Sequence, residues 1–142
     1  MASNSKEVLL WVLLGVIAIG LTVAGGCSSS QNKTGDISPE EALVLIQKNQ
    51  PSQNLIIIDV RTAEEFAGGH LEKAINIDFY ASTFREELSK LDRDKTYLIY
   101  CHSGARSSRA LAIMEELNFR EVYNISGGIT AWQAAGLPMV VE

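Results

Sequence analysis

The sequence predicts an α/β domain with a central parallel sheet flanked by helices, and two features of its pattern support that prediction. Short runs of apolar and β-branched residues, at 55–58 and 96–100, are typical of strands buried on both faces of a parallel sheet. Segments with the helical spacing of apolar residues lie between these runs. Strands and helices that alternate along a chain indicate a parallel sheet covered by helices.

Two helix starts carry capping boxes, in which a Ser or Thr and a Glu three residues later satisfy the first backbone N–H groups. Ser38 and Glu41 open a helix that also has Pro39 at its first position. Thr62 and Glu65 open a second, shorter helix. The other expected elements are strands at 55–58, 74–77, 96–100 and 122–125 and helices at 82–88, 107–117 and 129–135.

The N-terminal segment predicts attachment to a membrane. Residues 1–26 contain Lys6, an apolar stretch at 8–24 and two glycines before Cys27. This pattern resembles a bacterial lipoprotein signal peptide, whose cysteine carries diacylglycerol and acyl chains such as palmitate after cleavage. The apolar length also fits an uncleaved signal anchor, and both alternatives place the domain on the extracytoplasmic side of the cell membrane. The small polar residues at 27–35 predict a flexible tether, followed by one domain at 36–142.

Composition limits the partners and cofactors that the chain is expected to have. A length of 142 residues allows one domain after the N-terminal segment. The net charge is −5, and the absence of a Lys/Arg cluster argues against nucleic acid as a partner. Two cysteines are too few for a disulfide-stabilised scaffold, and no His or Cys set has the spacing of zinc ligands. We therefore expect no metal and no cofactor.

The residues that carry chemistry lie together in one short loop. Cys101 follows the strand at 96–100, and residues 102–106 (His-Ser-Gly-Ala-Arg) lead from it to a helix. The carboxyl ends of parallel strands are where such folds bind ligands, and a helix N-terminus favours a thiolate. Because of this position, Cys101 is the predicted nucleophile. Arg106 adds a planar cation that suits the binding of an oxyanion. The loop residues predicted to bind the substrate are His102, Ser103, Gly104, Ala105, Arg106 and Ser107.

Three segments of the chain together carry a family resemblance. Residues 57–61 (Ile-Ile-Asp-Val-Arg) precede a segment at 65–71 that contains Glu-Phe and Gly-His-Leu. The cysteine loop at 101–107 and the segment at 127–138, with Gly-Gly-Ile, Ala-Trp and Gly-Leu-Pro, follow in order. The combination resembles the signatures of the single-domain rhodaneses, which are thiosulfate sulfurtransferase-like proteins, and it implies the rhodanese-like α/β fold. Residues 72–73 (Glu-Lys) replace the Pro-Gly turn that is common in this family.

The resemblance implies a sulfurtransferase reaction. Cys101 would take the sulfane sulfur of thiosulfate or a related donor, hold it as a persulfide, and pass it to a thiol, to cyanide or to a thioredoxin-like protein. The six residues from Cys101 to Arg106 match the family's sulfurtransferases, whereas its phosphatase-like and arsenate-reducing relatives use seven. Two alternatives stay open: a phosphatase or arsenate reductase acting through the same thiolate, and a non-enzymatic persulfide carrier or docking module.

Three residues outside the loop are expected to support it. Asp59 and Arg61 are expected to form a structural charge network beneath the loop, and His70 to make structural hydrogen bonds. Within the loop, His102 is expected at the rim, where it binds the donor anion or faces water. Arg106 is expected to favour the thiolate and to hold loop carbonyls together.

Overall fold

The computed structural model describes residues 32–141, and strands alternate with helices throughout this part of the chain. The predicted α/β class with a parallel sheet is confirmed. The elements in chain order are β1 (Lys33–Ile37), α2 (Pro39–Asn49), β2 (Leu55–Asp59), α3 (Ala63–Ala67), β3 (Ala74–Asn76), α4 (Phe84–Ser89), β4 (Thr96–Tyr100), α5 (Ala105–Glu116), β5 (Glu121–Ile125) and α6 (Gly128–Ala134).

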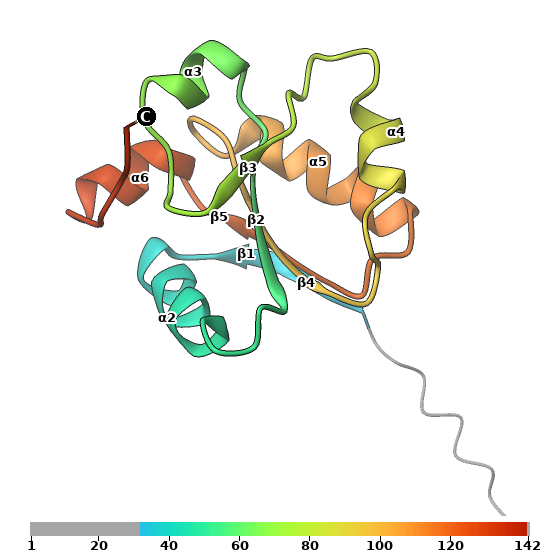
Figure 1. Ribbon diagram of the computed structural model, residues 1–142, viewed down its shortest axis with the longest axis horizontal. Helices are drawn as coiled ribbons and strands as arrows, with labels where there is room; N and C mark the ends of the chain where they lie inside the picture. Colours follow the sequence, from blue (N-terminus) through green and yellow to red (C-terminus); the bar gives the residue numbers. More distant parts are fainter. Residues whose placement is uncertain (1–31, 142) are drawn as a thin grey trace, which may run out of the picture.

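The strands form one sheet in the order β1-β5-β4-β2-β3, and neighbouring strands are parallel. The central strand β4 is buried along its whole length, as its apolar run predicts. It pairs with β2 from Leu55 opposite Thr96 to Asp59 opposite Tyr100. The carboxyl ends of these two strands therefore lie side by side, and the loops that follow them start at the same edge of the sheet (Figure 1).

Helices cover both faces of the sheet, α4 and α5 on one side and α2 and α6 on the other (Figure 1). Successive residues at the end of β4 point to opposite faces, as in any pleated strand. Ile99 and Cys101 belong to the core that includes Met114 of α5. Tyr100 belongs to the opposite core, with Trp132 of α6. The Cys101 side chain is thus on the α5 side of the sheet.

Both predicted capping boxes are present. The Ser38 hydroxyl accepts a hydrogen bond from the Glu41 backbone N–H at 3.2 Å, and the Glu41 carboxylate accepts one from the Ser38 N–H at 2.8 Å. Thr62 and Glu65 make the same reciprocal pair at the start of α3, at 3.3 and 3.1 Å. These local signals fix where α2 and α3 begin.

The predicted boundary between tether and domain is wrong. The tether was expected to extend over 27–35 and the domain to begin at 36, but β1 already starts at Lys33. This strand pairs with β5 along its length, and the Asn124 side chain of β5 donates a hydrogen bond to Asp36 at 2.8 Å. An edge strand is held by backbone hydrogen bonds to one neighbour, so β1 forms without the run of buried apolar residues that reveals an inner strand.

The predictions for the N-terminal segment fall outside the described residues. They are the signal peptide or anchor at 1–26 and the lipidation of Cys27. Among residues 32–141, no helix has the length and apolar character needed to cross a membrane.

Candidate active site

Cys101 lies in the loop that joins β4 to α5, with only 1% of its surface exposed. Gly104 caps the start of α5 with a φ of 98°, a left-handed conformation that glycine adopts without the steric cost of a Cβ. This turn directs the Gly104 backbone N–H at Cys101 Sγ over 3.1 Å. The buried Ser107 hydroxyl, in the first turn of α5, lies 3.3 Å from the same sulfur. The loop and the helix start therefore surround the sulfur with hydrogen-bond donors.

These donors lower the pKa of the Cys101 thiol below its ordinary value. Burial acts in the opposite direction and would raise the pKa, because it disfavours the charged thiolate. The Ser107 hydroxyl and the backbone N–H groups of Ser107, Gly104 and Ser103 favour the thiolate and outweigh the burial. The structure thus supplies the thiolate-stabilising surroundings that the sequence predicts for Cys101.

The N-terminus of α6 holds the same loop from the other side. The backbone N–H of Ile129 donates to the Cys101 carbonyl at 2.8 Å, and that of Thr130 donates to the His102 carbonyl at 3.1 Å. The Thr130 hydroxyl also donates to the His102 carbonyl, at 2.9 Å. The carbonyls of Cys101 and His102 are thus bound by α6, while the Gly104 N–H is directed at the sulfur. Sequence reasoning did not assign this role to residues 128–130, although a signature segment includes them.

Arg106 contacts Glu65 instead of the loop carbonyls that it was expected to hold. Its Nη1 lies 2.7 Å from Glu65 Oε2 and its Nη2 lies 2.8 Å from Glu65 Oε1, a bidentate ion pair. The guanidinium also lies over the ring of Tyr80, 5.6 Å from its centre. The sequence identified Glu65 as a capping residue and as part of a signature segment, but not as the partner of Arg106, which lies far along the chain.

The remaining loop residues form the rim of the site. The side chains of His102, Ser103 and Ala105 are exposed, as the sequence predicts for His102. The His102 Nε2 lies 3.4 Å from the Thr130 hydroxyl. These residues are placed to meet a molecule that approaches the loop from solvent.

Asp59 and Arg61 form the predicted charge network, and it is buried. The Arg61 guanidinium binds both carboxylate oxygens of Asp59, the shortest contact being 2.7 Å, and also donates to the Gly69 carbonyl at 2.6 Å. It lies 5.8 Å from the centre of the Tyr100 ring, one residue before Cys101. The network joins the end of β2 to the segment after α3, so it supports the scaffold.

Within residues 32–141, no three His, Cys, Asp or Glu side chains gather closely enough to hold a metal ion.

His70 has a structural position, as the sequence predicts. Its Nδ1 lies 3.0 Å from the Phe66 carbonyl oxygen, and its ring stacks on the Phe66 ring with 3.7 Å between centres. Its backbone pairs with Val140 near the C-terminus. The side chain is 3% exposed, so His70 contributes to the packing around α3.

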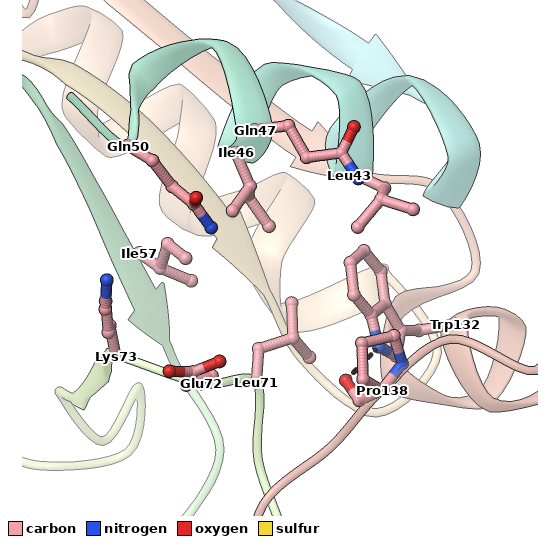
Figure 2. A pocket seen from close by; sticks show the side chains of 10 residues that line it. All are labelled: Leu43, Ile46, Gln47, Gln50, Ile57, Leu71, Glu72, Lys73, Trp132 and Pro138. Carbon is pink, nitrogen blue, oxygen red and sulfur yellow. Dashed lines mark hydrogen bonds between the residues drawn. The ribbon is translucent and has the colours of Figure 1, made fainter. Parts of the chain in front are cut away.

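A separate cavity of about 220 Å³ lies between α2 and the segment around Trp132 (Figure 2). Ile57 and Leu71 form part of its apolar wall, and Gln47 and Gln50 of α2 also line it. The Trp132 indole N–H donates to the Pro138 carbonyl at 2.9 Å, which leaves the apolar ring against the cavity. Its core residues belong to the sheet face opposite Cys101, so the cavity is not part of the cysteine site.

Residues 38–135 match the family described as the rhodanese-like domain. The chain belongs to this family. The segment that matches includes α2 through α6 and the whole Cys101 loop.

Two relatives and one solved structure place the rhodanese-like domain among known proteins. The chain is 34% identical over 96 residues to a sulfurtransferase of Allochromatium vinosum, covering 68% of this chain and 88% of that protein. It is 32% identical over 104 residues to a thiosulfate sulfurtransferase of Actinobacillus succinogenes, covering 73% and 88%. The crystal structure of a rhodanese-related protein from Thermoplasma volcanium matches with a TM-score of 0.63 and 30% identity, over 75% of this chain and 98% of that one. The predicted family and fold are confirmed, and the predicted enzyme class, sulfurtransferase, is that of the relatives.

Proposed function

We propose that the protein moves sulfane sulfur from thiosulfate or a related donor to a thiophilic acceptor through a persulfide on Cys101. The observation that carries the proposal is the sulfur's set of hydrogen-bond donors, with Gly104 N–H at 3.1 Å and the Ser107 hydroxyl at 3.3 Å. A lowered pKa of the Cys101 thiol increases the fraction of it that is present as the nucleophilic thiolate at neutral pH. The donors that stabilise the thiolate also suit the anionic outer sulfur of a persulfide.

In the first half-reaction, the Cys101 thiolate attacks the outer sulfur of thiosulfate. A bond forms between Cys101 Sγ and that sulfur while the sulfur–sulfur bond of thiosulfate breaks, and its electron pair leaves with sulfite. Cys101 is 1% exposed, so a terminal sulfur atom reaches Sγ more readily than the enclosed centre of a tetrahedral oxyanion. This favours sulfur transfer over the phosphatase or arsenate-reductase alternative.

In the second half-reaction, the acceptor attacks the outer sulfur of the persulfide. An acceptor thiolate, free or on a thioredoxin-like protein, becomes a persulfide, or cyanide becomes thiocyanate. The Cys101–sulfur bond breaks and its electron pair returns to Cys101 as the thiolate. The two steps in sequence predict ping-pong kinetics.

The test is the intact mass of the full-length protein after treatment with thiosulfate. The wild type is expected to gain the mass of one sulfur atom, and Cys101→Ser is expected to gain none. A persulfide on the Ser variant would move the chemistry away from Cys101. Hydrolysis of aryl phosphates that rivals sulfur transfer would favour the phosphatase alternative, and a wild-type loop that accepts no sulfur from any donor would favour the docking module.

We further propose that the domain is held at the extracytoplasmic face of the cell membrane by lipid on Cys27. The support is the sequence alone: Lys6, the apolar stretch at 8–24, and Gly-Gly before the cysteine. Globomycin, which blocks lipoprotein signal peptidase, is expected to make a longer precursor accumulate. An unchanged chain length on treatment would support the uncleaved anchor instead.

A further inference from the structure

The Glu65–Arg106 ion pair connects the segments that follow β2 and β4, because Glu65 lies in the first turn of α3 and Arg106 in the first turn of α5. These strands are neighbours in the sheet, but the chain continues from β2 to β3 on one side and from β4 to β5 on the other. Such a divergence leaves a crevice at the carboxyl ends of the strands, where open α/β sheets bind ligands. Glu65 of α3 and Arg106 of the Cys101 loop meet across this point, with two contacts of 2.7 and 2.8 Å.

Glu65 is itself held in place by the start of α3. Its Oε2 accepts hydrogen bonds from the Thr62 backbone N–H at 3.1 Å and from the Thr62 hydroxyl at 3.2 Å. The same oxygen receives Arg106 Nη1. Because the capping box fixes the carboxylate, the bidentate contact fixes the orientation of the guanidinium as well.

The ion pair also decides how much positive charge faces the sulfur. The hydrogen bonds and charge of Arg106 lower the pKa of Glu65 to about 2, so its carboxylate is ionised at neutral pH. The side chains of Arg106 and Glu65 are 17% and 33% exposed, which limits screening of the pair by water. The charge of Arg106 also interacts with Cys101. Glu65 therefore offsets the charge of a cation that acts on the Cys101 thiolate.

A guanidinium without this partner would present its full planar fork to an oxyanion. Arginine binds such groups bidentately and strongly, and thiosulfate and sulfite are both anions of this kind. Two of the five N–H donors of Arg106 are directed at Glu65 before any substrate arrives. The site is thus built to attract an anionic donor only moderately.

We propose that Glu65 is a positioning residue that orients Arg106 and offsets its charge, so that the site releases the sulfite formed when Cys101 takes up sulfur. The function of this ion pair in sulfur transfer rests on the proposed function. Without Glu65, the site would bind both thiosulfate and sulfite more tightly. The release of sulfite would then limit the turnover of the persulfide cycle.

The test compares Glu65→Gln with the wild type in the full-length chain. Gln is nearly the same shape as Glu and serves equally in a capping box, so the variant removes charge while keeping the start of α3. The probe is inorganic sulfate, and the readout is how far it protects Cys101 from alkylation by iodoacetamide, measured on the Cys101 peptide. The sulfate concentration that gives half protection is expected to fall about tenfold in Glu65→Gln.

Two further variants serve as controls. Glu64→Gln removes the same charge from the adjacent exposed position of α3 and is expected to leave sulfate protection as in the wild type. Glu65→Asp keeps the charge and is expected to stay closer to the wild type than Glu65→Gln does. Equal protection in Glu65→Gln and the wild type, or an equal gain in Glu64→Gln or Glu65→Asp, would overturn the proposal.

The kinetics separate this proposal from a merely structural role and from the proposed function itself. In Glu65→Gln, the KM for thiosulfate is expected to fall, kcat to fall with it, and sulfite to become a stronger product inhibitor. A damaged loop would raise KM, which would contradict the proposal. If the wild type forms no persulfide, the proposed function fails, while the sulfate protection still reports whether Glu65 limits anion binding.

Discussion

Gly128 lies directly against the backbone carbonyl of Cys101. A Cβ built at Gly128 would lie 2.4 Å from the Cys101 oxygen and 2.7 Å from the His102 oxygen, closer than real Cβ atoms approach. The φ of Gly128 is 58°, in the left-handed region. This contact lets the N-terminus of α6 bind the loop carbonyls, so the shape of the Cys101 loop depends on a residue that carries no chemistry of its own.

Gly128→Ala is expected to abolish most sulfur transfer and to lower stability by about 1–3 kcal/mol, because the new methyl group displaces the Cys101 loop. The matched control is Gly136→Ala, where φ is 69° but no atom lies within 4 Å of the added Cβ. It has the same backbone strain without the collision, so its turnover is expected to stay near the wild type at a cost of about 1 kcal/mol. Turnover and melting temperature of the two variants provide the comparison. Similar turnover in both would show that the close contact at Gly128 is unimportant.

Ser107→Ala is expected to raise the pKa of Cys101, because it removes the hydroxyl donor 3.3 Å from Sγ. The pKa is lowered in the wild type, so the thiolate population rises to its plateau at a lower pH than in an ordinary cysteine. In the variant, the rate of Cys101 alkylation by iodoacetamide is expected to follow a curve shifted to higher pH and to be slower at neutral pH than in the wild type. Ser108→Ala, at the next and exposed position, is the control. Identical pH curves for wild type and Ser107→Ala would remove Ser107 from the stabilisation of the thiolate.

Most of the fold was predictable because its signals are local. The capping boxes at Ser38 and Thr62 need residues only three positions apart, and the buried run of β4 needs only its own five residues. Strand β1 has neither kind of signal, because its pairing with β5 involves residues far along the chain. At residue Lys73, where the family's turn often has glycine, the structure shows a φ of 65°, so the lysine adopts the left-handed conformation of that turn.

The candidate site also has features that the local sequence predicts and features that depend on distant residues. Cys101, Gly104 and Ser107 are contiguous, and the thiolate-stabilising geometry follows from a loop that runs into a helix. The contact of Arg106 with Glu65 joins residues 41 positions apart, and nothing in the local pattern of either residue indicates the other. Such pairings depend on which strands become neighbours in the sheet, which hydrophobic periodicity does not determine.

The stability gained from the Glu65–Arg106 pair is expected to disappear in acid. The pKa of Glu65 is lowered from 4.5 to about 2 in the folded protein, so the pair stabilises the fold fully above pH 4.5 and its contribution is lost as the pH falls from 4.5 towards 2. At neutral pH, Glu65→Gln is expected to lower the free energy of unfolding by about 1 kcal/mol, since the pair is partly exposed. Urea unfolding of both proteins from pH 7 to pH 2 would measure the difference. A difference that does not shrink across the acid range would show that the charge of Glu65 is not the source of the stability.

Arg106 separates the effect of charge from that of geometry. Arg106→Lys keeps the cation but cannot donate to both Glu65 oxygens from one planar group, so turnover with thiosulfate and cyanide is expected to fall by about tenfold or more. Arg106→Met removes the cation too, leaving the Glu65 carboxylate without its partner, and is expected to lose more turnover and about 1 kcal/mol more stability than Lys. Combining Arg106→Met with Glu65→Gln is expected to recover part of the stability lost in Arg106→Met but no activity, because the unpaired carboxylate is gone while the site still lacks its cation. The melting temperature and the cyanide-dependent turnover of the three variants would show whether the charge or the geometry of Arg106 matters. Normal turnover in Arg106→Met would exclude Arg106 from the site.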